Sequence, residues 1–149
     1  MNAPGDIRGR TVSVGASLDA SSERGEYLRK GTVWNEIVEN RRRMQEQCPR
    51  VDFYISSTVS IFNAIHIIDF HREWCHLGLI KPQDFNVNIL QSPDWYRIDV
   101  LPPEFKDQIR TRVTEHLEWL EHQDKLTRAT SGFRALIKFM DAEDRQHQL

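Results

Sequence analysis

The chain has 149 residues, of which 39% are hydrophobic and 28% charged, and its 20 basic and 22 acidic side chains give a net charge of -2. This length and composition predict one soluble globular domain and exclude a complete (β/α)8 barrel, which needs about 250 residues. The balanced charge favours neither nucleic acid nor an anionic membrane as a partner. No apolar run approaches the roughly 20 residues that span a bilayer, and residues 1–10 lack the apolar core of a signal peptide, so we expect a cytoplasmic protein.

The first third of the chain predicts one strand and one helix. Residues 1–10, rich in glycine and proline, predict a flexible lead-in. Residues 11–19 alternate between apolar and small polar side chains, which is the period of a strand. Residues 20–31 are polar and predict a loop, after which Thr32 stands where the N-cap of a helix is expected. The buried side of that helix, which ends before Pro49, carries Trp34, Ile37, Val38 and Met44.

Two further strand and helix units follow. Residues 51–58 and 85–90 alternate like the first strand, and the helix between them ends at Gly78. Its apolar positions are Ile67, Phe70, Trp74 and Leu77. A connection over residues 91–103 leads to a long amphipathic helix with Phe105, Ile109, Val113, Leu117 and Leu120 on one side. A short helix at about 132–140 and a polar tail at 143–149 complete the chain.

Strands that alternate with helices predict an α/β fold with right-handed crossovers. We expect a partial (β/α) barrel of about three parallel strands, followed by C-terminal helices. One face of each strand is lined by Ser, Thr, Asn and Asp, although parallel strands are normally apolar on both faces. This favours a polar ligand at the carboxyl ends of the strands, where the chain carries Ser17, Asp19, Thr58, Ser60, Asn63, Asn88 and Gln91. The alternative is a small sheet, open or antiparallel, with its polar face in water.

Several segments of the sequence, taken in order, carry a resemblance to one enzyme family. Residues 17–20 and 24–32, with Trp34 and Asn40, resemble the fourth strand and helix of the barrel of radical S-adenosylmethionine enzymes. Residues 58–63, with His66, Asp69, Phe70 and Trp74, are similar to the fifth unit, and residues 86–102 to the sixth strand and its exit. Residues 118–120 and 124–139 resemble the closing helices of the twitch-type subgroup. The resemblance implies that residues 11–101 are the C-terminal half of the barrel and that 102–142 form a helical segment.

The resemblance also implies the cofactors, S-adenosylmethionine and a [4Fe-4S] cluster. It places Ser17 and Asp19 near the ribose or carboxylate of S-adenosylmethionine, with Thr58, Asn63 and Asn88 lining the cofactor or substrate side. We assign Arg29, His66 and Gln91 to the substrate side. The chemistry is hydrogen abstraction by a 5′-deoxyadenosyl radical, on a peptide or a small polar substrate.

The cluster motif C-x3-C-x2-C is absent from these 149 residues, whose two cysteines, Cys48 and Cys75, are far apart in sequence. We therefore predict no metal ligands in this chain and no activity for it alone, and we leave open whether it is an enzyme. A half barrel exposes an unpaired sheet edge. We expect this edge to be covered by an N-terminal barrel half on another chain, or by a second copy of this chain. The third alternative is that the sequence is a truncated fragment, in which case nothing covers the edge. The alternative function is a non-catalytic α/β module, or a degenerate remnant, that pairs through this edge.

Three weaker signals remain open. His71 and Cys75 have the i,i+4 spacing of two metal ligands on one helix face, but the obvious local third ligand, His76, points to a different face. Arg24 and Arg29, with Glu26, are placed either to clamp an anion or to form surface salt bridges. Residues 95–96, Trp-Tyr, are placed in a loop where they can close over a substrate.

Overall fold

A computed structural model describes residues 11–123 and 128–146, so the predicted lead-in at 1–10 lies outside the described residues. The elements are β1 (Ser13–Ala16), α1 (Ser22–Leu28), α2 (Trp34–Gln47), β2 (Asp52–Val59), α3 (Ile67–His76), β3 (Phe85–Ile89), the 3-10 turns η1 (Asp94–Tyr96) and η2 (Ile98–Val100), α4 (Pro103–Gln123) and α5 (Arg128–Gln146). No helix in this part of the chain is long and apolar enough to cross a bilayer.

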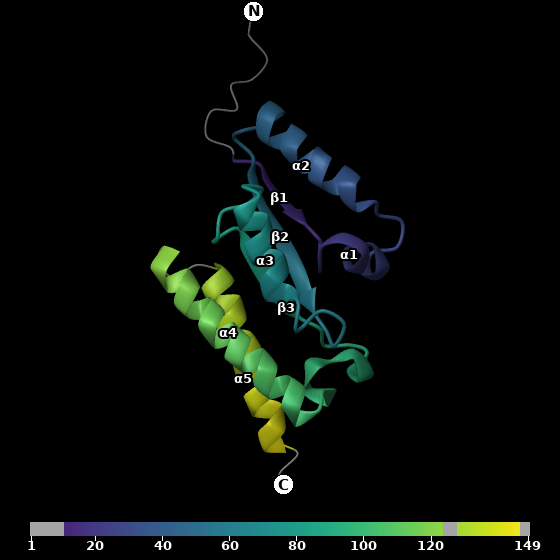
Figure 1. Ribbon diagram of the computed structural model, residues 1–149, viewed down its shortest axis with the longest axis vertical. Coiled ribbons are helices and arrows are strands. Elements are labelled where there is room, and N and C mark those ends of the chain that lie inside the picture. Colours follow the sequence, from purple (N-terminus) through teal and green to yellow (C-terminus); the bar gives the residue numbers. More distant parts are fainter. Residues whose placement is uncertain (1–10, 124–127, 147–149) are drawn as a thin grey trace, which may run out of the picture.

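The three strands form one parallel sheet in the order β1-β2-β3. Ser13 pairs with Asp52 at the start of the first ladder, and Val59 pairs with Ile89 at the end of the second. Helices connect both pairs of neighbouring strands, and two long helices follow (Figure 1). The predicted α/β class, with three parallel strands alternating with helices before C-terminal helices, is confirmed.

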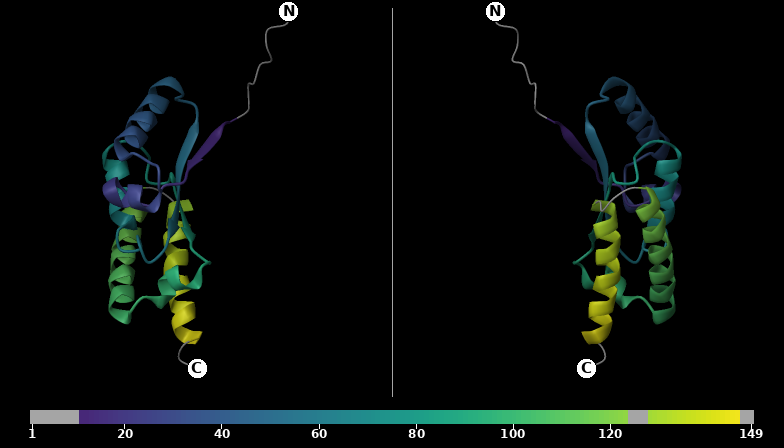
Figure 2. Two further views of the ribbon diagram at one scale, coloured as in Figure 1. Left: turned by 90° about the vertical axis from the view of Figure 1, so that its right-hand side faces the viewer. Right: turned by 90° about the vertical axis from the view of Figure 1, so that its left-hand side faces the viewer.

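The elements lie in two layers. In Figures 1 and 2, helices α1 to α4 form one layer, and the sheet together with α5 forms the other. Every crossover helix therefore covers the same face of the sheet. A sheet in sequential strand order with all its helices on one face has the arrangement of a barrel sector, whose other face points inwards. Within the described residues, no helix covers that other face (Figure 2).

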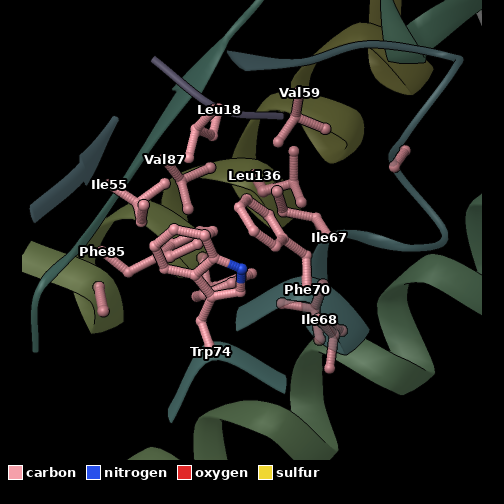
Figure 3. Close-up of a cluster of buried hydrophobic side chains, with 14 of the residues drawn as sticks. Leu18, Ile55, Val59, Ile67, Ile68, Phe70, Trp74, Phe85, Val87 and Leu136 are labelled. Atoms are coloured by element: carbon pink, nitrogen blue, oxygen red, sulfur yellow. The ribbon is translucent and has the colours of Figure 1, made fainter. Parts of the chain in front are cut away.

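The hydrophobic core fills the space between the two layers. Side chains along β2 alternate between buried and partly exposed, and Phe53, Ile55 and Val59 point to the helices. Trp74 and Phe70 of α3 pack beside Ile55 and Phe85 (Figure 3), and the Phe70 ring meets the rings of Trp74 and Phe85 at centroid distances of 5.7 Å. Each fully buried aromatic side chain contributes about 2 kcal/mol or more of transfer free energy, so this face holds the layers together.

Some predicted boundaries were wrong. The predicted loop at 20–31 contains α1, and the following helix begins at Trp34 without a cap from Thr32, whose hydroxyl donates to the Arg29 carbonyl. Instead the Glu26 carboxylate accepts the Trp34 N–H at 2.8 Å, so α1 caps α2 through tertiary contact. Gly78 follows the end of α3 with a φ of 71°, as predicted for a helix stop. The last helix, α5, is longer than the predicted 132–140 and includes residues 143–146 of the predicted tail.

Helix α5 lies along the outer edge of β3. Because Asp84 O accepts the Ile55 N–H and Leu90 N–H donates to Val59 O, the even-numbered residues of β3 bond to β2. The backbone N–H and C=O groups of Val87 therefore point away from β2, towards the outer edge of the sheet. Gly132 of α5 lies so close that a Cβ added to it would be 3.1 Å from Val87 N and 2.8 Å from Val87 Cβ. The helix thus takes the place of a further strand at this edge.

We predict that Gly132→Ala destabilises the protein. Glycine to alanine in a helix normally gains about 1 kcal/mol, but here the new methyl group meets the β3 backbone, and we expect a loss of about 1 to 3 kcal/mol. Urea unfolding monitored by circular dichroism measures the difference. Ser131→Ala, at the exposed neighbouring position, is the control and should be neutral or stabilising. A stabilised Gly132→Ala protein would contradict the close packing of α5 on β3.

Candidate functional site

The carboxyl ends of β1 and β2 bring together four of the predicted site residues. Asp19 accepts the Thr58 N–H through Oδ1 at 2.8 Å and the Arg29 Nε–H through Oδ2 at 2.8 Å. Asn63 Nδ2 donates to the carbonyls of Asp19 and Thr58 at 2.9 and 3.0 Å, and Asn63 Oδ1 accepts the Ser60 N–H at 2.8 Å. These contacts tie the loop after β1 to the loop after β2.

The chain itself uses most of the hydrogen-bonding capacity of this network. Asn63 is fully buried, Asp19 is 8% exposed, and both side chains bond within the protein. The Arg29 guanidinium is committed to Asp19, and Glu26 is committed to the Trp34 N–H, so they do not form the anion clamp considered from the sequence. Asp19 and Asn63 act here on the geometry of the loops, which positions their neighbours at the end of the sheet.

The uncovered sheet face carries the remaining predicted residues. Ser56 and Thr58 of β2 lie on this face in register with Asn86 and Asn88 of β3. The Asn88 amide donates to Ser56 Oγ at 3.0 Å and accepts from Asn86 at 3.4 Å. Ser17 lies exposed just after β1. Hydroxyl and amide groups therefore line the carboxyl half of this face, which we call the polar face (Ser17, Ser56, Thr58, Asn86 and Asn88).

The amino half of the same sheet face is closed by aromatic and basic side chains. The Tyr54 ring lies over Gly15 of β1, where a Cβ would be 2.7 Å from Tyr54 Cζ. The guanidinium of Arg128, at the start of α5, lies 4.4 Å from the centre of the Tyr54 ring. This cation–π contact covers the amino half of the face next to Gly15, whereas no such pair lies over the described residues of the carboxyl half.

His66 and Gln91, assigned to the substrate side, lie in the loops that follow β2 and β3. His66 lines a cavity of about 150 Å³ together with Arg24, Asp69 and Glu73. Partial burial, followed by the positive charge of Arg24, lowers the pKa of His66. Gln91 is exposed, and its amide nitrogen donates to the Ile89 carbonyl at 3.2 Å. The two side chains do not form one cluster with the Asp19 network.

The loops also place Trp95 and Tyr96 next to a residue that the sequence did not single out. Phe62, after β2, meets the Tyr96 ring edge-on at a centroid distance of 5.0 Å, and the Ile61 N–H donates to the Tyr96 carbonyl at 3.0 Å. Trp95 is 68% exposed, and the Phe62 and Tyr96 side chains are each 40% exposed. Because phenylalanine so often fills a core, an exposed one is not visible from sequence alone.

Another cavity lies at the opposite end of the sheet. Its volume is about 670 Å³, and residues around the amino ends of β2 and β3 line it, including Arg41, Arg50, Asp52, Lys81 and Asp84. Arg41 itself donates to the Leu79 carbonyl at 2.8 Å and lies over the Phe53 ring at 3.9 Å. The lining contains both cations and carboxylates, so its charge favours neither an anionic nor a cationic ligand.

His71 belongs to a buried chain of polar contacts instead of a metal site. Arg72 Nε donates to His116 Nδ1 at 3.1 Å, so His116 carries its proton on Nε2, which lies 2.8 Å from His71 Nδ1. His71 then donates from Nε2 to the Pro82 carbonyl at 2.9 Å. Both imidazoles are fully buried, and every ring nitrogen is used. These hydrogen bonds connect α3 to α4.

The described residues hold no group of three His, Cys, Asp or Glu side chains that fits a metal ion. Cys48 is exposed beside the large cavity, and Cys75 is half-buried on α3, where burial raises the pKa of its thiol to about 12. Comparison of the chain with protein-family models, with curated proteins and with solved structures gives no match.

We predict that the protein becomes less stable as the pH is lowered, because of the histidine pair. Burial lowers the pKa of both His71 and His116 below the ordinary 6.5, so the folded protein takes up these protons less readily than the unfolded chain. Their contribution is complete above about pH 6.5 and is lost as the pH falls towards the lowered pKa values. Urea unfolding at about pH 7.5, 6.5 and 5 should show a steady decrease in the free energy of unfolding. The exposed His122→Gln variant should show the same decrease, and a flat profile would contradict the neutral pair.

Proposed function

We propose that this chain is one sector of a (β/α) barrel and that its polar face forms part of a ligand pocket in a radical S-adenosylmethionine enzyme. One observation carries the barrel part of the proposal: a parallel sheet in sequential order has all its crossover helices on one face, while hydroxyl and amide groups line the other. The resemblance in sequence carries the assignment to this enzyme class. A cytoplasmic location belongs to the same proposal.

The iron–sulfur cluster does not fit this chain. Three cysteine ligands are required and the sequence has two, which lie on different elements, one exposed and one half-buried. We therefore derive no step through a cluster in these residues. The proposal places the cluster outside this sector.

S-adenosylmethionine fits the polar face by the type of group that lines it. Ser17 presents a hydroxyl group of the kind that binds a ribose hydroxyl or a carboxylate, and Thr58 and Asn88 line the cofactor or substrate side with hydroxyl and amide groups. Asp19 and Asn63 hold the loops around them, as their internal hydrogen bonds require. With an electron supplied by a donor outside this chain, this cofactor would supply the radical that abstracts a hydrogen atom from a substrate. The role of this chain is to bind, to orient and to line the pocket.

The first test is calorimetric titration of the full chain with S-adenosylmethionine. We expect binding to the wild type and a loss of affinity of at least about tenfold in Ser17→Trp, because an indole at this exposed position covers the carboxyl end of the polar face. Glu39→Trp, on the exposed side of α2 in the helical layer, is the matched control and should bind like the wild type. Absence of binding to the wild type, or equal affinity of Ser17→Trp, would count against the proposed ligand.

A second candidate function is association through the outer edge of β1. Because the Val12 carbonyl accepts the Asp52 N–H, the even-numbered residues of β1 bond to β2, and the backbone groups of Ser13 and Gly15 point outwards. No described segment pairs with them, whereas α5 covers the opposite edge of the sheet. An open edge is a template for another strand.

Ser13→Pro tests this second function. The substitution removes an outward N–H and leaves the ladder to β2 intact, so we expect loss of association with unchanged folding. Analytical ultracentrifugation of the chain measures self-association, and circular dichroism checks the fold. A wild type that remains monomeric at high concentration, or a Ser13→Pro protein that associates equally well, would argue against pairing of two copies through β1.

A further inference from the structure

An exposed aromatic cluster lies at the carboxyl end of the sheet. Its members are Phe62 in the loop after β2 and Trp95 and Tyr96 in η1, and we call them the aromatic cluster. The Trp95 and Tyr96 rings lie 6.2 Å apart at an angle of 73°, and the Phe62 and Tyr96 rings lie 5.0 Å apart at 60°. Three aromatic side chains that remain this exposed while touching one another leave apolar area without an internal partner.

The aromatic cluster and the polar face lie at the same end of the sheet. Thr58 and Asn88 form the last rung but one of the β2–β3 ladder, and Leu90 N–H still donates to Val59 O. The loops that carry the three rings start directly after these residues, and the Ile61–Tyr96 backbone hydrogen bond joins them. In Figure 2, the segment between β3 and α4 projects to the side of the sheet that the helices leave uncovered.

The combined surface is neutral. The polar face contains no charged residue, and Arg29 at its end is paired with Asp19. Beside the rings, Arg97 donates to Asp99 with two bonds of 3.0 Å and lies 3.8 Å from Asp94. The charged neighbours are therefore paired with one another, and a phosphate group of charge -2 finds no unpaired cation among these residues.

We infer that the aromatic cluster and the polar face together bind a glycosyl unit of the substrate. A sugar ring has an apolar face of C–H groups that packs on an aromatic ring, and its rim of hydroxyls both donates and accepts hydrogen bonds. Asn88, Thr58 and Gln91 offer amide and hydroxyl partners for that rim, and Trp95 offers the largest exposed ring. This inference rests on the proposed ligand pocket and adds the chemical class of its substrate.

The test is saturation-transfer difference NMR of the full chain with four neutral probes: maltotriose, cellotriose, mannotriose and chitotriose. We expect at least one of them to bind, with the strongest transfer to ring C–H protons. Trp95→Ala and Asn88→Ala should each weaken that probe by about tenfold, which corresponds to about 1.4 kcal/mol. Tyr27→Ala removes an equally exposed ring on α1 and should bind like the wild type, since Tyr27 is 78% exposed and lies on another element.

The outcomes separate this inference from the proposed function. No binding of any of the four probes to the wild type would overturn it, as would equal loss in Tyr27→Ala and Trp95→Ala. Adenosine is added as a fifth probe, because its base can stack on the same rings and its ribose carries hydroxyls. Adenosine binding that depends on Trp95, without binding of a saccharide, would overturn the inference and leave the S-adenosylmethionine proposal intact.

Discussion

A parallel sheet whose helices all cover one face has to leave its other face to something else, and this constraint organises the molecule. The helical side of the sheet carries the apolar residues, from Ile55 and Phe85 in the strands to Trp74 in α3, and it provides the hydrophobic free energy of the fold. The other side carries serine, threonine and asparagine, which contribute little to burial. Their presence in a parallel sheet supports the proposal that a ligand binds there.

Two hydrogen-bonded side chains fix the part of that face where chemistry is expected. The Asp19 carboxylate and the Asn63 amide join the loops after β1 and β2, with Arg29 as the counter-ion. A buried carboxylate with this many partners holds a loop in one position, because the loss of any partner leaves a desolvated polar group. The network thereby holds Thr58 and the start of the loop to Phe62 in place.

One edge of the sheet is covered by a helix and the other is open, for a simple geometric reason. At β3, the absence of a side chain on Gly132 lets α5 approach the strand backbone, so this edge is closed by a helix. At β1, the outward groups of Ser13 and Gly15 have no described neighbour to pair with. Any strand added to the sheet joins at β1, and it would extend the polar face.

The sequence by itself determined the α/β class, the order of strands and helices and the polar face of the strands, because periods of 2 and 3.6 are properties of neighbouring residues. The carboxyl-end position of Asp19, Thr58, Asn63 and Asn88 follows from the same reasoning. The sequence did not show that α1 exists, because this short helix is stabilised by contacts such as Glu26 with the α2 backbone.

Only the tertiary structure decided which predicted site residues the chain uses itself. Asp19 and Asn63 are buried and committed to internal hydrogen bonds, while Ser17 and Asn88 are exposed on the open face, where Asn88 also bonds to Ser56. The partner of Tyr96, Phe62, was invisible for the same reason, since about 30 residues separate them in sequence. Periodicity specifies the face of an element on which a side chain lies, and only the packing of distant segments specifies what that side chain meets.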